Sequence, residues 1–281
     1  MFWTPDAFLS SLIEEDLHLV DLTSLALGLE RKKGAVSAVP KKNLVAAGVE
    51  AACRLFELCG CQAEALVQSG KAASQGEPLL KASGPADRLH AAYKVAQNVM
   101  EYSSGIAGRC RQMLEKAREA SQDIEILVTR KHMPGAKKLS LAAALAGGAS
   151  IHRTGLSDSI LVFDQHREFI GGPEGLISLV PKMRKAFPER KLAAEANGLE
   201  EALAFAKAAI DVIQLERFSS ETMAEAVREI KAISATAIVL AAGGLSAENA
   251  FAAAASGVDG LVTSWPYFGP PADISMVFRA G

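Results

Sequence analysis

The sequence predicts an α/β protein in which a small N-terminal α+β domain precedes a barrel of the TIM type. After residue 124, apolar strand-like runs alternate with helical stretches, which is typical of a parallel sheet covered by helices. These runs stop at polar or glycine-rich segments, and a TIM barrel builds its active site from residues just beyond its strand ends. A doubly wound open sheet is the alternative, but no GxGxxG motif follows a predicted strand to support it.

The composition limits the classes of function that this protein can have. The 281 residues, 49% of them hydrophobic, suit two domains or one large α/β unit with a sizeable core. A net charge of −2 supplies no global basic field for nucleic acid, and the apolar runs are too short to cross a bilayer. The first residues lack the features of a signal peptide, so we expect a cytoplasmic protein with neither nucleic acid nor membrane as partner. Cys59-Gly60-Cys61 is not a CxxC pair, and we expect its thiols to be structural.

The elements of the first domain follow from apolar periodicity and turn residues. Helices are expected at residues 5–16, 45–59 and 87–100, and strands at 34–39, 61–67 and 79–82. Ser103-Ser104-Gly105 is expected to interrupt the third helix, which resumes over 106–120. We place the domain boundary in this helical region, giving a first domain of residues 1–112 and a barrel of residues 113–269. The alternating tail, 270–281, is expected to return to the small sheet.

The barrel region gives six strand candidates and five helices between them. The strands are expected at residues 125–129, 159–163, 191–195, 211–215, 237–241 and 260–263. The helices are expected at residues 139–146, 173–187, 199–209, 221–234 and 247–255.

Charged and glycine-rich segments stand where these strands end. Cations follow the first strand and the next turn, at Arg130, Lys131, His152 and Arg153, which suggests a pocket for an anionic ligand. Two later strands end in Glu195 and Glu216, whose carboxylates suit Mg²⁺ or ribose hydroxyls. The last two strands end in Gly243-Gly244 and Ser264, where barrels commonly bind phosphate. The alternatives are a solvated basic face, an exposed acidic residue at position 195 and an ordinary tight turn at Gly243-Gly244.

Several blocks together resemble the quinolinate phosphoribosyltransferases, also called nicotinate-nucleotide pyrophosphorylases. The blocks are Asn98, Ser104–Ala107, Thr129-Arg130-Lys131 with Pro134-Gly135, Gly147-Gly148, His152–Asp158, Asp164-Gln165-His166, Leu199–Ala202, Asp211–Ile213, Ala242–Gly244 and Gly257–Asp259. The likeness covers nearly the whole chain. It implies an N-terminal α/β sandwich, an incomplete α/β barrel, and a homodimer with a shared active site, or a higher oligomer built on it. It also implies transfer of ribose phosphate from 5-phosphoribosyl 1-pyrophosphate with Mg²⁺ and no organic cofactor.

The resemblance implies roles for individual residues. The residues implied in substrate binding are Lys94, Arg130, His152, Arg153 and Phe163. Those implied in catalysis are Lys131, Glu195 and Glu216, and those implied in phosphate binding are Gly243, Gly244 and Ser264. Glu195 and Glu216 would face Mg²⁺ indirectly.

Four positions depart from the family pattern. Phe163 stands for a lysine, Lys94 for an arginine, Glu216 for an aspartate and Ala242 for a serine. Together with Tyr93–Asn98 and Thr263–Phe268, these changes resemble the ModD branch, whose members are associated with molybdenum transport genes and described as pyrophosphorylases.

The expected activity is that of a pentosyltransferase which joins an anionic aromatic or heterocyclic substrate to 5-phosphoribosyl 1-pyrophosphate and releases pyrophosphate. We expect poor use of quinolinate, because Phe163 removes a cation and Lys94 replaces a forked guanidinium. Three alternatives stay open. One is an ordinary carboxylating nicotinate-nucleotide pyrophosphorylase of NAD biosynthesis, the second a non-catalytic anion sensor linked to molybdate supply, and the third a lyase that forms a Schiff base at Lys131.

Overall fold

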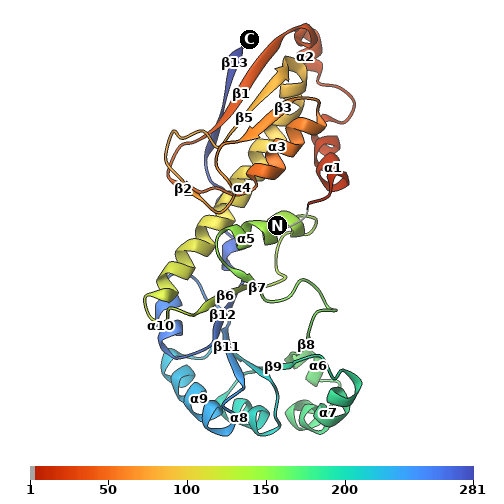
Figure 1. Cartoon of the computed structure of the whole chain (residues 1–281). Coiled ribbons are helices and arrows are strands. Elements are labelled where there is room, and N and C mark those ends of the chain that lie inside the picture. Colours follow the sequence, from red (N-terminus) through yellow and green to blue (C-terminus); the bar gives the residue numbers. More distant parts are fainter. Residues whose placement is uncertain (1–3) are drawn as a thin grey trace. The chain divides into compact units, whose positions relative to one another are not determined.

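A computed structural model describes residues 4–281 and confirms the predicted fold class, an N-terminal α+β part and a curled parallel sheet (Figure 1). The chain divides into two compact units. The first comprises the residues up to Arg111 together with His132–Gly148 and Pro266–Gly281; the second comprises Gln112–Lys131 and Ala149–Trp265. None of the helices in the described part is long and apolar enough to cross a membrane.

The first unit holds an antiparallel sheet and the helices around it. Its strands are β1 (Lys33–Pro40), β2 (Leu44–Val45), β3 (Gln62–Ala65), β4 (Ala72–Ala73), β5 (Leu80–Pro85) and β13 (Ile274–Ala280). Its helices are α1 (Asp6–Leu17), α2 (Leu22–Ala26), α3 (Val49–Leu58), most of α4 (Ala86–Arg118) and α5 (Lys137–Ala146), with a 3₁₀ turn, η1 (Leu29–Arg31). A second 3₁₀ turn, η2 (Trp265–Tyr267), begins where the second unit ends.

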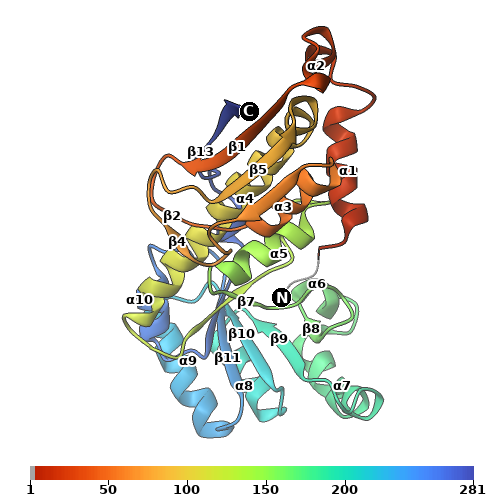
Figure 2. The same ribbon diagram turned by 45° about the horizontal axis from the view of Figure 1, so that its top comes forward.

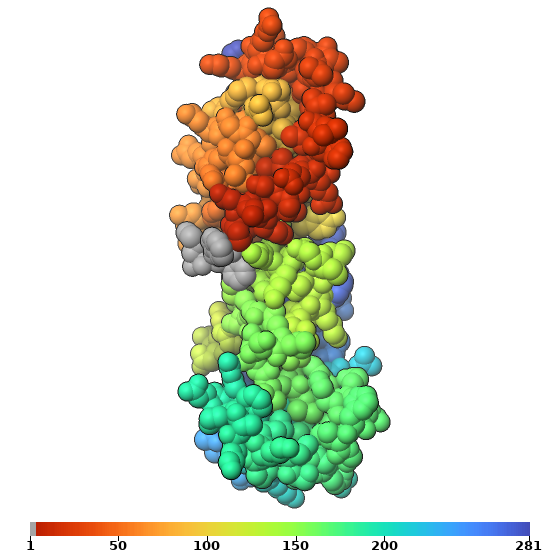
Figure 3. Space-filling view, turned by 90° about the vertical axis from the view of Figure 1, so that its right-hand side faces the viewer, coloured from red at the N-terminus to blue at the C-terminus, as the bar shows by residue number. Residues whose placement is uncertain are grey.

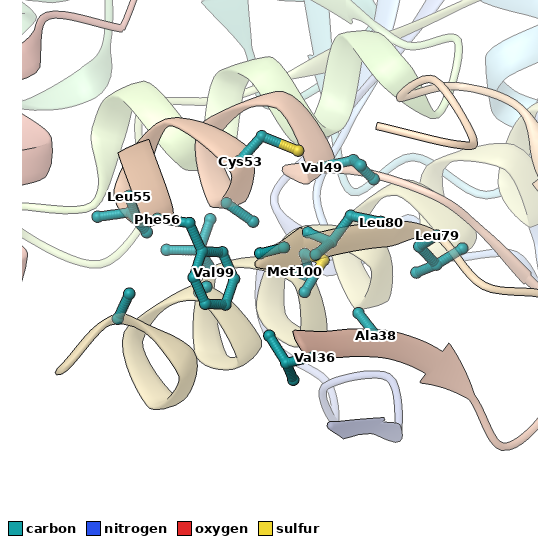
Figure 4. Close-up of a cluster of buried hydrophobic side chains, with 14 of the residues drawn as sticks. Val36, Ala38, Val49, Cys53, Leu55, Phe56, Leu79, Leu80, Val99 and Met100 are labelled. Carbon is teal, nitrogen blue, oxygen red and sulfur yellow. The ribbon is translucent and has the colours of Figure 1, made fainter. Parts of the chain in front are cut away.

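Four of these strands form one sheet in the order β13-β1-β5-β3, in which β13 pairs antiparallel with β1 from Gly34 to Pro40. Strands β2 and β4 pair in a separate two-stranded sheet. Alternate residues of β1 are buried, as a sheet with one covered face requires. Val36 and Ala38 of this strand lie in one core cluster with Phe56 and Leu55 of α3 and Met100 of α4 (Figure 4). Helix α1 lies on the surface of this unit, among the red atoms of Figure 3.

Helix α4 is continuous, so the interruption expected at Ser103-Ser104-Gly105 is wrong. The small residues allow close packing within the first unit instead of breaking the helix. The Ser104 hydroxyl accepts a hydrogen bond from the backbone N–H of Ala47 at 3.0 Å. A Cβ on Gly105 would lie 2.8 Å from the carbonyl oxygen of Pro270. Small side chains here serve helix packing and not a turn.

The second unit is built on a seven-stranded sheet in which all strands are parallel. The strands are β6 (Glu125–Val128), β7 (Ser150–Ile151), β8 (Ile160–Val162), β9 (Leu192–Ala196), β10 (Val212–Glu216), β11 (Ile238–Ala242) and β12 (Gly260–Thr263). The order β7-β6-β12-β11-β10-β9-β8 pairs the first strand in sequence, β6, with the last, β12. That pairing is the closure of a barrel, and the described strands leave it open between β7 and β8. The sheet is visibly curled in Figure 2.

Helices follow the strands as predicted, with some shifted bounds. They are α6 (Asp164–Arg167), α7 (Gly172–Ala186), α8 (Leu199–Lys207), α9 (Ser220–Ile233) and α10 (Ala250–Ala255). Helices α8, α9 and α10 pack on the outer side of the curled sheet (Figure 1). The two-residue strand β7 and the one-turn helix α6 were not expected, because elements this short contain no complete hydrophobic period.

Candidate active site

One edge of the parallel sheet collects ten of the eleven site residues expected from the sequence. Because all seven strands run in the same direction, their C-terminal ends meet at this edge. Arg130 and Lys131 follow β6, His152 and Arg153 follow β7, and Phe163 follows β8. Glu195 lies near the end of β9 and Glu216 at the end of β10; Gly243-Gly244 and Ser264 follow β11 and β12.

Glu195 lies within electrostatic reach of the second carboxylate, Glu216. Burial raises the pKa of Glu195, and the negative charge of Glu216 raises it further. Gln214, Arg167 and Lys131 act in the opposite direction. Glu195 and Glu216 therefore form a partly buried acidic pair within electrostatic reach of a lysine. Such a pair favours a ligand that brings hydroxyl donors or positive charge.

Gln214 connects the acidic pair to the inside of the sheet. It lies opposite Glu195 on the neighbouring strand and is 4% exposed. Its Nε2 donates a hydrogen bond of 3.0 Å to Glu195 Oε2, while its Oε1 is buried without a partner among the described residues. A buried amide oxygen without a donor is costly, so a donor from a water or a ligand would stabilise this arrangement.

Charge on the cationic side comes from arginine and lysine. Arg130 and Lys131 are exposed, whereas Arg153 is buried and within electrostatic reach of Arg130. Burial, together with the charge of Arg153, lowers the pKa of His152 to about 4. His152 is then neutral at pH 7, and the expectation that it adds positive charge is wrong. It can still bind a ligand through ring hydrogen bonds.

Phe163 presents its aromatic ring at the end of β8. The guanidinium of Arg153 lies over its ring, 5.4 Å from the centroid. His166 stacks on the same residue, with ring centroids 5.7 Å apart and planes 18° apart. The His166 Nδ1 accepts a hydrogen bond of 3.0 Å from the Phe163 backbone, which fixes this geometry. Phe163 is half-buried, with its ring against the buried Arg153.

Arg167 connects the ends of β8 and β9 through its side-chain contacts. Its side chain is 4% exposed and forms ion pairs with Asp164 and, at 3.2 Å, with Glu201. It also donates to the backbone oxygen of Glu195. A buried arginine with this many acceptors holds a strand end in one position.

The glycine pair forms the edge beside β10. Gly243 and Gly244 have φ angles of +87° and +69°, a region that other residues rarely adopt. A Cβ on Gly243 would lie 2.7 Å from Glu216 Oε1. Close approach therefore requires glycine at 243. Next to Ser264, the buried Thr263 hydroxyl donates to Leu245 at 2.7 Å and accepts from the Trp265 N–H, which ties this loop to the end of β12.

Comparisons with known proteins point to one family. The N-terminal domain model of quinolinate phosphoribosyl transferase matches residues 21–104, and its C-terminal domain model matches residues 106–277. The chain belongs to the quinolinate phosphoribosyl transferase family. This confirms the resemblance on which several of the expected roles depend.

Relatives within the family differ in their names. The chain is 40% identical over 250 residues to a Rhodobacter capsulatus protein named as a pyrophosphorylase, ModD, covering 89% of this chain and 96% of the relative. It is 30% identical over 275 residues to a Synechocystis protein named as a carboxylating nicotinate-nucleotide pyrophosphorylase, covering 96% and 91%. The crystal structure of NadC from Streptococcus pyogenes has the same fold, with a TM-score of 0.90 at 23% identity, covering 100% of this chain and 99% of that one.

The remaining residue expected in the site, Lys94, lies in the first unit of this family member. It is exposed on α4, its Nζ donates to Gln97 at 2.8 Å, and it lies over the Tyr93 ring. Its role in the site stays a prediction.

The carboxylates of this site fit Mg²⁺ only if a substrate supplies further oxygen ligands. Within residues 4–281, no group of three or more His, Cys, Asp or Glu side chains could hold a metal ion. Mg²⁺, however, commonly uses one or two carboxylates, with substrate phosphates and water completing its shell. Glu195 and Glu216 suit that arrangement, directly or through water.

Three residues of this site were missed from the sequence. Gln214 is a single polar residue in the otherwise apolar run Val-Ile-Gln-Leu, which is a signal for a buried functional side chain. Arg217, whose Nε lies 3.5 Å from Glu216 Oε1, follows a strand end, the position at which the other cations of the site stand. Arg167 lies in a short helix and gave no sequence signal.

Proposed function

We propose that this chain transfers ribose phosphate from 5-phosphoribosyl 1-pyrophosphate to a ring nitrogen of an aromatic or heterocyclic anion less charged than quinolinate. The contact between Arg153 and Phe163 carries this proposal. One cation and one aromatic face stand side by side at the position where the family has a lysine. The family relation and the pyrophosphorylase names of its relatives support the reaction class.

In this reaction the bond from C1 of the ribose to the diphosphate breaks, and the acceptor nitrogen forms the new bond to C1. Positive charge develops on the ribose as the diphosphate leaves. Glu195 and Glu216 stabilise that charge from one side, because preorganised groups in a partly buried site act more strongly than in water. Lys131 and Arg130, which follow β6, balance negative charge on the diphosphate in this proposal.

The acceptor pocket favours a single negative charge. A buried carboxylate without a cationic partner is costly. Arg153 provides one buried guanidinium, and Phe163 provides a surface on which an aromatic ring can stack. His152 is neutral at pH 7 and adds no second cation. A ring with one carboxylate or a comparable anion suits this combination better than quinolinate with two.

Bound Mg²⁺ would neutralise diphosphate charge, with Glu195 and Glu216 on its protein side. The dependence on Mg²⁺ is measured by calorimetry with 5-phosphoribosyl 1-pyrophosphate, with and without the ion. Tight binding of molybdate, without pyrophosphate release for any acceptor, would instead favour a sensor linked to oxyanion supply.

Phe163→Lys tests the acceptor pocket. The wild type should use quinolinate slowly, below roughly 1 s⁻¹, and the lysine should raise kcat/KM for quinolinate by about tenfold or more, because one charged hydrogen bond contributes about 1.5–3 kcal/mol. A steady-state assay of nicotinate mononucleotide and pyrophosphate measures both.

Phe163→Met is the matched control, since it removes the ring without adding charge. It should leave quinolinate use unimproved. Rapid quinolinate turnover by the wild type would contradict the altered pocket and support ordinary carboxylating activity.

A further inference from the structure

Arg217 has an unfavourable backbone conformation directly beside the expected phosphate site. Its φ is +58°, and among the described non-glycine residues only His18 and Ala209 also have positive φ. The left-handed region costs free energy for a residue with a Cβ, and such residues persist where surrounding structure or function requires them. Glycine or asparagine would suit this turn better.

The neighbours of Arg217 accommodate its side chain. Its backbone N–H donates to the carbonyl oxygen of Ala242 at 2.9 Å, which places it beside the glycine pair. A Cβ on Gly243 would lie 2.5 Å from Arg217 Cγ, so only glycine leaves room for the arginine stem. The Arg217 Nε lies 3.5 Å from Glu216 Oε1, and the side chain is 82% exposed. A strained backbone and an adjacent glycine thus hold a solvent-facing guanidinium over the ends of β10 and β11.

Backbone donors lie next to this guanidinium. In the part of the chain that the structure describes, neither Gly243 nor Gly244 donates its N–H to another residue. Two backbone N–H groups beside an arginine make a donor set that suits a phosphate monoester.

We infer that Arg217 binds the 5′-phosphate of the phosphoribosyl donor together with the N–H groups of Gly243 and Gly244. This inference rests on the proposed function and adds to it a residue that sets affinity for one end of the donor. Arg130 and Lys131 follow β6, which is separated from β11 by β12. The site therefore has two separate cationic groups, one for the diphosphate and one for the 5′-phosphate, with the carboxylates of Glu195 and Glu216 to face the ribose.

The variant Arg217→Asn removes the guanidinium and relieves the backbone strain. Calorimetry with ribose 5-phosphate and with inorganic pyrophosphate then separates the two ends of the donor. We expect Arg217→Asn to weaken binding of ribose 5-phosphate by about tenfold or more. Pyrophosphate binding should stay within about twofold, and the melting temperature should be unchanged or higher.

Ala209→Gly is the matched control, because Ala209 has a φ of +56° in the same unit, just before β10. It should raise stability without changing either affinity.

The outcomes separate this inference from the proposed function. If wild type binds both ligands and turns over, but Arg217→Asn binds ribose 5-phosphate as wild type does, Arg217 is not a phosphate residue and the transferase proposal stands. Equal losses for both ligands would also overturn the assignment. If wild type binds neither ligand nor 5-phosphoribosyl 1-pyrophosphate, both proposals fail.

Discussion

Burial decides the charge of individual side chains in this site. His152 has a pKa of about 4 because the ring is partly buried beside Arg153, and Glu195 has a raised pKa because it is partly buried beside Glu216. Positive charge at the ends of β6 and β7 therefore comes from Arg130, Lys131 and Arg153. The hydrogen bond from Gln214 favours the ionised form of Glu195.

Gln214→Leu tests that dependence. We assume that Glu195 acts as a carboxylate, so activity should fall as pH drops through its raised pKa. Removing the Nε2–H donor removes an interaction that favours the ionised form, so the pKa should rise further. The acidic limb of the kcat/KM profile should therefore move to higher pH, which a pH–rate series measures.

Ser256→Ala controls for loss of a buried polar group in the same unit, since its hydroxyl donates to the nearby carbonyl oxygen of Ala253 at 2.7 Å. Its acidic limb should match that of wild type. An unshifted limb in Gln214→Leu would mean that the amide does not control the ionisation of Glu195.

At the scale of the elements, two glycines of helix α4, Gly105 and Gly108, have different surroundings. Gly105 lies against the Pro270 and Pro271 backbone, whereas a Cβ on Gly108, one turn later, would meet nothing within 4 Å. The same Gly→Ala change should therefore have opposite effects at the two positions.

Gly105→Ala should destabilise the protein by about 1–3 kcal/mol, because the added methyl meets backbone that cannot easily move. Gly108→Ala should stabilise by about 0.5–1 kcal/mol through helix propensity. Chemical denaturation of both variants measures the difference. Equal effects at the two positions would show that the segment 270–271 yields to the added methyl.

At the scale of the whole molecule, the family resemblance predicts a homodimer with a shared site, in which Lys94 of one subunit lies near His152 of the other. Lys94→Ala and Glu195→Gln should each lose most activity alone. When the two variants are mixed and re-associated, random pairing should make about half of the dimers mixed ones. One of the two sites in a mixed dimer has both residues intact, so the mixture should recover about a quarter of the wild-type activity. Light scattering gives the oligomeric state, and a fully active monomer would contradict the prediction.

The sequence by itself determined the fold class and much of the site. Its alternating apolar runs predicted six of the seven strands of the curled sheet, and the polar residues that follow them predicted the cationic and acidic groups at one edge. This succeeds because strand direction alone decides which ends meet in a parallel sheet. The resemblance added Lys94, Phe163 and the reaction class.

Only the tertiary structure decided which side chains touch and what charge they carry. The contact of Arg153 with Phe163, the neutral state of His152 and the bond from Gln214 to Glu195 depend on how the strands pack and on which side chains they bury. Helix α4 runs unbroken through Gly105, whose lack of a side chain allows the close approach of Pro270 from more than half of the chain away. Local sequence patterns report periodicity and turn chemistry, whereas burial and cross-strand neighbours arise only when the strands assemble.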